Sequence, residues 1–72
     1  MKYLFEVRLN YAEDHLEILY QTESVILACA HYLEKIDFYK ADPGCDAESL
    51  ELCLWDEEEE EILEILEEAS FK

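Results

Sequence analysis

The sequence predicts a single α+β domain over residues 1–72, with the element order ββαβα. Three segments alternate apolar and polar residues, as half-buried strands do. Two further segments place apolar residues at helical spacing. The chain contains one Gly and one Pro, so little of it is suited to a flexible linker. We therefore expect a three-stranded, mainly antiparallel sheet with two helices packed on it.

The first two strands are predicted at residues 2–10 and 15–22. In the first segment the alternating apolar residues are Tyr3, Phe5, Val7 and Leu9. In the second they are Leu16, Ile18 and Tyr20. A period of two is typical of a strand with one buried face. Because the polar residues 11–14 between the segments can turn, the two strands are predicted to form a β-hairpin.

The first helix is predicted to follow Ser24 and to end between Asp37 and Lys40. The hydroxyl of Ser24 can accept a hydrogen bond from an amide of the first helical turn, so Ser24 is suited to the N-cap. Apolar residues then recur at helical spacing and predict a stripe that faces the sheet. The stripe consists of Ile26, Cys29, Ala30, Leu33 and Ile36.

The third strand is predicted at residues 49–55. Asp-Pro-Gly at residues 42–44 indicates a turn within the preceding segment 41–48. Alternation then resumes, with one face formed by Leu50, Leu52 and Leu54 and the other by Glu51, Cys53 and Trp55. This pattern predicts a strand with one apolar face.

The last element is predicted as a helix that begins at Asp56. Asp56 and Glu59 have the spacing of a capping box, with Asp in place of Ser or Thr. The positive end of a helix dipole also favours acids in the first turn. The expected buried stripe is Ile62, Ile65, Leu66 and Ala69, with Leu63 beside it. The opposite, acidic face is formed by Glu57, Glu60, Glu61, Glu64, Glu67 and Glu68.

The chain is strongly acidic, with 20 Asp and Glu against five Lys and Arg and a net charge of −15. The charge is uneven, because residues 42–72 hold thirteen acids and one base, Lys72. Contacts to phosphate need Lys and Arg, so this half is not expected to bind nucleic acid directly. Apolar residues make up 51% of the chain, which indicates a folded domain rather than a disordered acidic tail.

Metal, cofactor and catalytic sites are not predicted. The three cysteines Cys29, Cys45 and Cys53 form no CxxC pair, and their odd number without a signal peptide favours a reducing compartment, the cytoplasm. The spacing of the loop acids does not match a calcium-binding EF-hand. No nucleophile motif or Gly-rich phosphate loop is present, so we expect no enzyme. The longest apolar run, residues 25–30, is too short to span a membrane.

The acidic face of the predicted last helix has two interpretations. Like charges three or four residues apart on a helix cost roughly 0.2–0.5 kcal/mol per pair, and no base relieves them before Lys72. The face is either a solubilising surface or an array that binds a basic partner. The candidate contact residues are Asp42, Asp46, Glu48, Glu51, Asp56, Glu57, Glu58, Glu60, Glu61, Glu64, Glu67 and Glu68. Trp55 either packs under the last helix or serves as an aromatic anchor in an interface.

In its size, its charge, its base-free span 42–68 and the acidic run 56–61, the chain resembles the small acidic DNA-mimic inhibitors of bacteriophages. That class includes many anti-CRISPR and anti-restriction proteins. The resemblance implies a protein of the host bacterial cytoplasm that occupies the basic nucleic-acid channel of a defence complex and excludes DNA, without a cofactor. The class has no common motif, so no contact residue is transferred from it.

The alternative function is that of an adaptor or assembly subunit. Such a protein would dock through apolar surface, for example the Trp55 face or an exposed sheet edge, and its acids would keep it soluble. A monomer and a homodimer are compatible with either function. Salt separates the two, because apolar docking should survive high salt and charge pairing should not.

Overall fold

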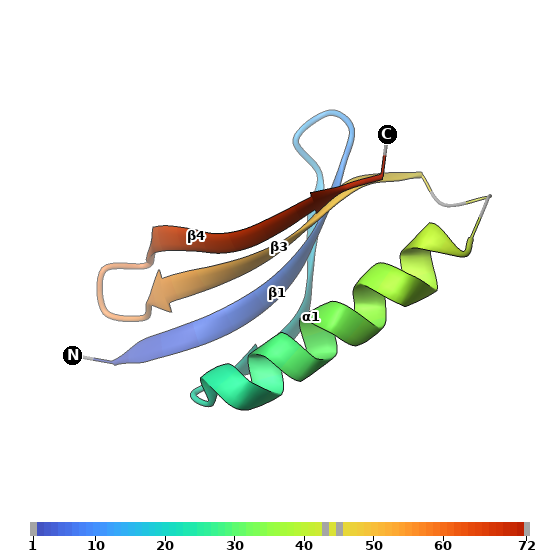
Figure 1. Ribbon diagram of the computed structural model, residues 1–72. Coiled ribbons are helices and arrows are strands. Elements are labelled where there is room, and N and C mark those ends of the chain that lie inside the picture. Colours follow the sequence, from blue (N-terminus) through green and yellow to red (C-terminus); the bar gives the residue numbers. More distant parts are fainter. Residues whose placement is uncertain (1, 43, 45, 72) are drawn as a thin grey trace.

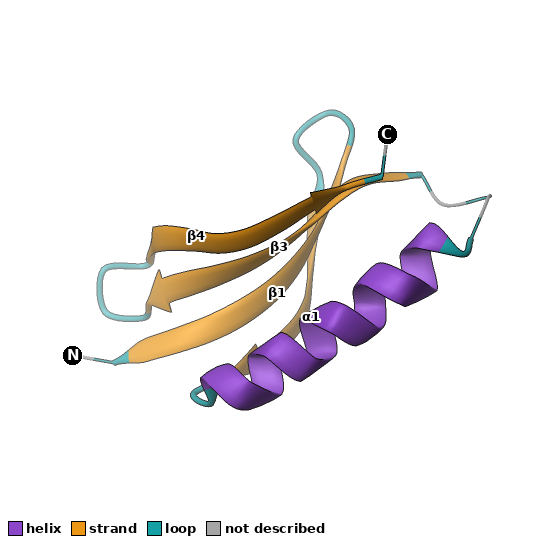
Figure 2. Cartoon of the chain, in the orientation of Figure 1, coloured by secondary structure: helices purple, strands orange, loops and turns teal. Residues whose placement is uncertain are grey.

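The computed structural model describes residues 2–42, 44 and 46–71, and shows an α+β domain with the element order ββαββ (Figures 1 and 2). The four strands form one antiparallel sheet in the order β2-β1-β3-β4, and α1 lies across one face of it. The strands are β1 (Tyr3–Tyr11), β2 (Leu16–Thr22), β3 (Ala47–Asp56) and β4 (Glu61–Ser70), and the helix is α1 (Val25–Lys40). The predicted α+β class is therefore confirmed. The expected last helix and three-stranded sheet are wrong.

The predicted β-hairpin of β1 and β2 is confirmed. Its turn places Glu13 and Asp14 at positive φ (64° and 59°), and the Tyr11 amide donates to the His15 carbonyl at 2.7 Å. The ladder shifts register once, where Val7 faces Tyr20 but Arg8 faces Ile18. The strict alternation seen in the sequence is thus interrupted by one extra residue in β2.

The helix α1 begins as predicted, because the Ser24 hydroxyl accepts a hydrogen bond from the Leu27 amide at 3.3 Å. Its predicted buried stripe is right only in part, because Cys29 and Ile36 are half-buried and pack against the core but the other three residues are exposed. Ala28 and Tyr32 are buried, whereas Ile26 is 79% exposed and Leu33 is 63% exposed. The N-terminal half of α1 is apolar nearly all round, so periodicity alone did not identify which side meets the sheet.

The core lies between α1 and strands β1 and β3. Its buried members are Val7, Leu9, Ala28, Tyr32, Ala47, Leu50 and Leu52. The helix packs mainly on β1, β2 and β3, so β4 extends the sheet beyond the helix. The predicted third strand is confirmed, with bounds slightly wider than residues 49–55.

Residues 61–70 form the edge strand β4, which contains two β-bulges. Each bulge adds one residue, so Glu side chains that recur every three residues still point to one face of the strand. Glu67, Glu64 and Glu61 lie opposite Leu52, Leu54 and Asp56 of β3. These β3 residues are two apart, so their partners in β4 project to one face. The register skips Leu66 and Leu63, which are the extra residues of the two bulges. The Glu-Ile-Leu repeat of residues 61–66 therefore fits a strand although its spacing resembles that of a helix.

The face of the sheet opposite α1, which we call the open face, contains a buried ion pair. Arg8 Nε lies 3.1 Å from Glu6 Oε1, and the side chains of Arg8 and Glu6 are 10% and 1% exposed. The Nε–H does not point at the oxygen, so this contact is ionic rather than a hydrogen bond. The Gln21 amide donates a hydrogen bond to the other oxygen of Glu6. The buried charges of Glu6 and Arg8 are thus stabilised by polar side chains of the sheet itself, because no helix covers this face.

Candidate functional site

The acidic run 56–61 forms the β3–β4 turn and not the start of a helix. Asp56 is 2% exposed, and its Oδ1 accepts hydrogen bonds from the amides of Glu58 and Glu59 at 3.0 and 3.2 Å. Glu60 adopts a positive φ of 53°. Asp56 is therefore a structural residue of the turn and is too buried to contact a partner. The exposed residues 57–60 are called the acidic turn below.

Two rows of side chains run along β4. The acidic row is Glu61, Glu64 and Glu67, whose β3 partners include the core residue Leu52, so it projects toward the α1 side. The apolar row is Ile62 and Ile65, which lie opposite Trp55 and Cys53 and project to the open face. All five side chains of the two rows are exposed. The edge strand thus has a charged side and an apolar side.

The structure does not bring all the predicted contact residues together. Glu48 lies near the start of β3, about 26 Å along the strand from the acidic turn. Asp42 and Asp46 precede β3 and belong to the same distant end, where Asp42 Oδ1 accepts from the Gly44 amide. The predicted Asp-Pro-Gly turn includes Pro43, which lies outside the described residues, as does Cys45.

Glu51 and Glu68 lie on the open face, directly opposite one another in the β3–β4 ladder. Glu51 is half-buried, accepts a hydrogen bond from Asn10 and contacts the Cys53 thiol at 3.6 Å. Glu68 is exposed. The acidic turn and the acidic row therefore form one surface that follows β4 on the α1 side. Glu68 lies on the opposite face of the sheet, and Glu51 belongs mainly to the polar interior of that open face.

Trp55 lies half-buried on the open face, and its ring is 5.4 Å from the Arg8 guanidinium carbon. The prediction that Trp55 packs under the last helix is wrong, because residues 61–70 form a strand. A cation over an aromatic face is attracted by the ring quadrupole. Arg8 and the indole therefore hold each other in place beside the apolar row.

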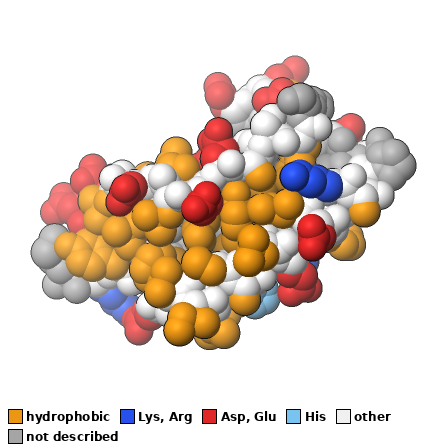
Figure 3. Space-filling model, in the orientation of Figure 1, with side chains coloured by type: hydrophobic (Ala, Val, Ile, Leu, Met, Phe, Trp, Pro, Cys, Tyr) orange, Lys and Arg blue, Asp and Glu red, His pale blue; other side chains and the backbone are white. Residues whose placement is uncertain are grey.

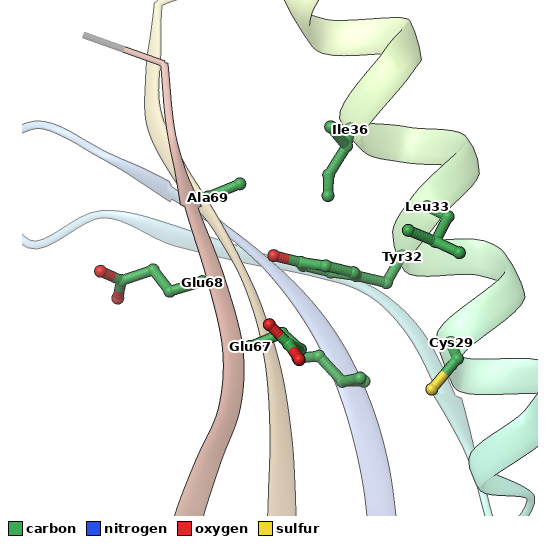
Figure 4. Close-up of a pocket in the computed structure, with 8 residues that line it drawn as sticks. Cys29, Tyr32, Leu33, Ile36, Glu67, Glu68 and Ala69 are labelled. Atoms are coloured by element: carbon green, nitrogen blue, oxygen red, sulfur yellow. The ribbon is translucent and has the colours of Figure 1, made fainter.

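A groove of about 450 Å³ separates α1 from β4. It is lined by Cys29, Tyr32, Leu33, Ile36, Leu52, Glu67, Glu68 and Ala69. Figure 4 shows Tyr32 extending from α1 toward the sheet, with Glu67 on the groove side of β4 and Glu68 pointing away from the helix. On the face drawn in Figure 3, hydrophobic side chains cover a broad area, and acidic side chains lie at its margin. Sequence patterns missed this groove because the residues that line it on α1 were expected to be covered.

Two ionisable side chains near these surfaces have raised pKa values. Burial raises the pKa of the Cys53 thiol to about 12, and the nearby carboxylate of Glu51 adds to this effect. Burial also raises the pKa of the Tyr32 phenol, with smaller contributions from Glu67 and Glu68. Both groups are therefore protonated at neutral pH. Cys53 is not a thiolate nucleophile under these conditions.

Within the described residues, no three His, Cys, Asp or Glu side chains are placed to hold a metal ion. His31 stacks on Tyr20 with ring centroids 3.7 Å apart, and His15 lies against Tyr11 with centroids 5.3 Å apart. Both imidazoles thus pack against rings within the fold. No helix in this part of the chain is long and apolar enough to cross a membrane.

Comparisons of the chain with protein-family models, with curated proteins and with solved structures find no significant match to any of them.

Proposed function

We propose that the chain is a non-enzymatic inhibitor that binds a basic nucleic-acid-binding protein in the cytoplasm of a bacterial host and prevents it from binding DNA. In this proposal it belongs with the anti-CRISPR and anti-restriction type of DNA mimic. The surface that meets the partner consists of the acidic turn and the acidic row, while Glu68 adds charge on the other face of the same strand. The chain needs neither a cofactor nor a covalent step for this function.

The continuous acidic surface along β4 is the observation that supports this proposal most. Between residues 42 and 68 the chain has no Lys or Arg. Lys2 approaches the acidic turn from the start of the chain, with its Nζ 3.5 Å from Glu57, but both side chains are about half exposed to water. An exposed pair of this kind contributes little, so the surface keeps a strong negative potential.

The spacing of the acidic row also suits a basic channel. Each Glu of the row lies opposite a β3 residue two positions from the next, so neighbouring carboxylates are about 6.7 Å apart along the strand. One strand of duplex DNA places a phosphate every ~3.4 Å along the helix axis. The acidic row therefore matches about every second phosphate, and Lys and Arg side chains that bind phosphates could reach it.

A second candidate function is supported by a different observation. Ile26 and Leu33 of α1 are each more than half exposed, and Leu33 lines the apolar groove one helical face away from the core. A contiguous apolar surface on a small soluble domain is typical of a protein-binding site. In this second proposal the chain is an adaptor or assembly subunit that docks through α1, and its acids serve solubility.

Affinity capture from bacterial lysate tests the two proposals against each other. Tagged chain is loaded with lysate, washed at low or high salt, and challenged with duplex DNA before the bound proteins are identified. The inhibitor proposal expects a DNA-binding protein that is released by high salt and by DNA, because screening and phosphate competition both remove charge pairing. A partner that resists both treatments would contradict it and favour docking through α1.

A further inference from the structure

The outer edge of β4 is an extended template for another strand. β4 has ten residues and lies at the end of the strand order β2-β1-β3-β4, with β3 on its inner side. The outer side of such a strand presents backbone amide and carbonyl groups that an incoming chain can pair with. Proteins commonly blunt an edge of this length with charges and bulges, and β4 carries both, so a strand added here must match its charges and its register.

We propose that this edge binds an extended segment of a partner protein as a fifth strand, and that the segment alternates basic and apolar residues. The two rows on β4 determine this chemistry. Side chains directly opposite one another on neighbouring strands are about 4.5–5.5 Å apart and interact. Residues of the segment that face Glu61, Glu64 and Glu67 are basic, and those that face Ile62 and Ile65 are apolar.

The bulges at Leu63 and Leu66 do not prevent this pairing. On its inner side, β4 pairs with a β3 strand that keeps regular alternation, from Leu52 to Asp56. The two rows of β4 therefore already match a regularly alternating neighbour. A segment of the same regularity matches the rows from the outer side.

A second copy of this chain is a poorer occupant of the edge. Antiparallel pairing of β4 with β4 would bring two acidic rows against each other, and like charges directly opposite are destabilising. The other edge strand, β2, has seven residues and a single acid, Glu17, so it lacks the acidic row. Charge complementarity thus favours a basic segment over a second copy of the chain, and favours the edge at β4 over the edge at β2. The basic character of the partner rests on the proposed function. What is new is that the partner pairs its backbone with the edge of β4.

The probe is a capped synthetic peptide of about eight residues that alternates Lys and Val, a common strand length. Two matched peptides are N-methylated on alternate amides, one on the Lys residues and the other on the Val residues. In a strand, alternate amides point to opposite sides, so one methylated peptide keeps its pairing edge and the other loses it. A peptide with Glu in place of Lys controls for charge. Binding is followed by the NMR shifts and hydrogen exchange of the protein amides.

The protein variants compare the edge with its surroundings. Glu64→Gln and Glu67→Gln each remove one carboxylate of the acidic row and should weaken peptide binding by about 1.5- to 5-fold. Glu34→Gln removes an exposed carboxylate of α1 and is the matched control for net charge. Leu33→Gln alters the groove, where its 63% exposed side chain can be replaced without loss of the core, and should leave peptide binding unchanged.

We expect the unmodified peptide to slow hydrogen exchange in β4, with one methylated peptide binding comparably and the other at least about tenfold more weakly. Equal binding of both methylated peptides would overturn strand addition but leave the charge-based inhibitor proposal standing. Loss of binding in Leu33→Gln would place the peptide in the groove and overturn the inference. A dimer of the chain that the peptide dissociates would overturn it in favour of a second copy. Failure of every Lys peptide to bind at low salt would count against the inhibitor proposal as well.

Discussion

Glu64 lies directly opposite Leu54 in the ladder between β3 and β4, on the side of the sheet that faces α1. This pairing places a charged side chain beside the core, where it stays exposed because β4 extends beyond the helix. The same relationship recurs for Glu67 and Leu52. The acidic row is therefore a product of the sheet edge rather than of a helix face.

Substitution of Ile65 tests that residues 61–70 form a strand. Ile65 is half exposed, so its replacement leaves little cavity. We expect Ile65→Ala to destabilise the fold by up to about 1 kcal/mol and Ile65→Thr to cost less, because β-branched residues suit strands. Urea unfolding measures both variants. If the Ile65→Ala variant were as stable as the original chain, or more stable, the result would indicate that this segment is a helix, where Ala is preferred.

Much of the fold could be predicted from local patterns, and the exception has a physical cause. The hairpin, α1 with its Ser24 cap and strand β3 were each found from local patterns, although β2 contains one bulge and the period of α1 did not identify its buried side. In β4 a period of three arises from two bulges, and a period of three is close to that of a helix. The abundance of Glu, a good helix former, added to the error. The β-branched Ile62 and Ile65 were the available signal for a strand.

The candidate site could be predicted only in part, because it depends on which elements lie side by side. The acidic row and, apart from Glu59, the acidic turn are among the predicted contact residues, but Asp56, which was also predicted, is a buried turn residue. The apolar groove was missed because α1 is apolar on more than one side. Whether Leu33 or Tyr32 meets the sheet is decided by packing against β1 and β3 and not by helical period.

Loss of one partner of the Glu6–Arg8 ion pair should destabilise the fold, whereas replacement of both partners by apolar residues should be tolerated. Arg8→Met leaves the carboxylate of Glu6 buried without a counterion, which typically costs about 3–5 kcal/mol. This loss is roughly half of the ~4–11 kcal/mol expected for a domain of this size. The double variant Glu6→Leu/Arg8→Met should recover most of that loss. Unfolding free energies in a double-mutant cycle measure the coupling. Additive losses from the two single variants would show that the pair is not coupled.

The fold should lose stability in alkaline solution. The pKa of Cys53 rises from 9.0 to about 12 on folding, so the folded chain holds this proton more tightly than the unfolded chain. Its contribution is therefore fully present below pH 9 and is lost as the pH rises from 9 toward 12. The raised pKa of Tyr32 acts in the same direction. We expect Cys53→Ala to reduce the alkaline loss measured by urea unfolding. An identical pH profile in that variant would argue against this assignment.

Relief of like-charge repulsion should stabilise the free chain. Glu68→Lys replaces the carboxylate opposite Glu51 with a base and should add about 0.2–1 kcal/mol. Added salt should also raise the melting temperature of the original chain, which has a net charge of −15, because salt screens the repulsion among its acidic side chains. Glu34→Lys on α1 changes the net charge equally and is the control. Equal gains from both variants would assign the effect to net charge rather than to the cross-strand pair.

Inhibition of DNA binding by a captured partner tests the central claim most directly. The purified partner is titrated onto labelled duplex DNA in the presence of the original chain, of Glu61→Gln/Glu64→Gln/Glu67→Gln, or of the charge-matched control Glu13→Gln/Glu17→Gln/Glu34→Gln. We predict competitive inhibition by the original chain and the control, and at least about tenfold weaker inhibition by the variant of the acidic row. A ternary complex of partner, DNA and chain, or equal inhibition by both triple variants, would contradict the account.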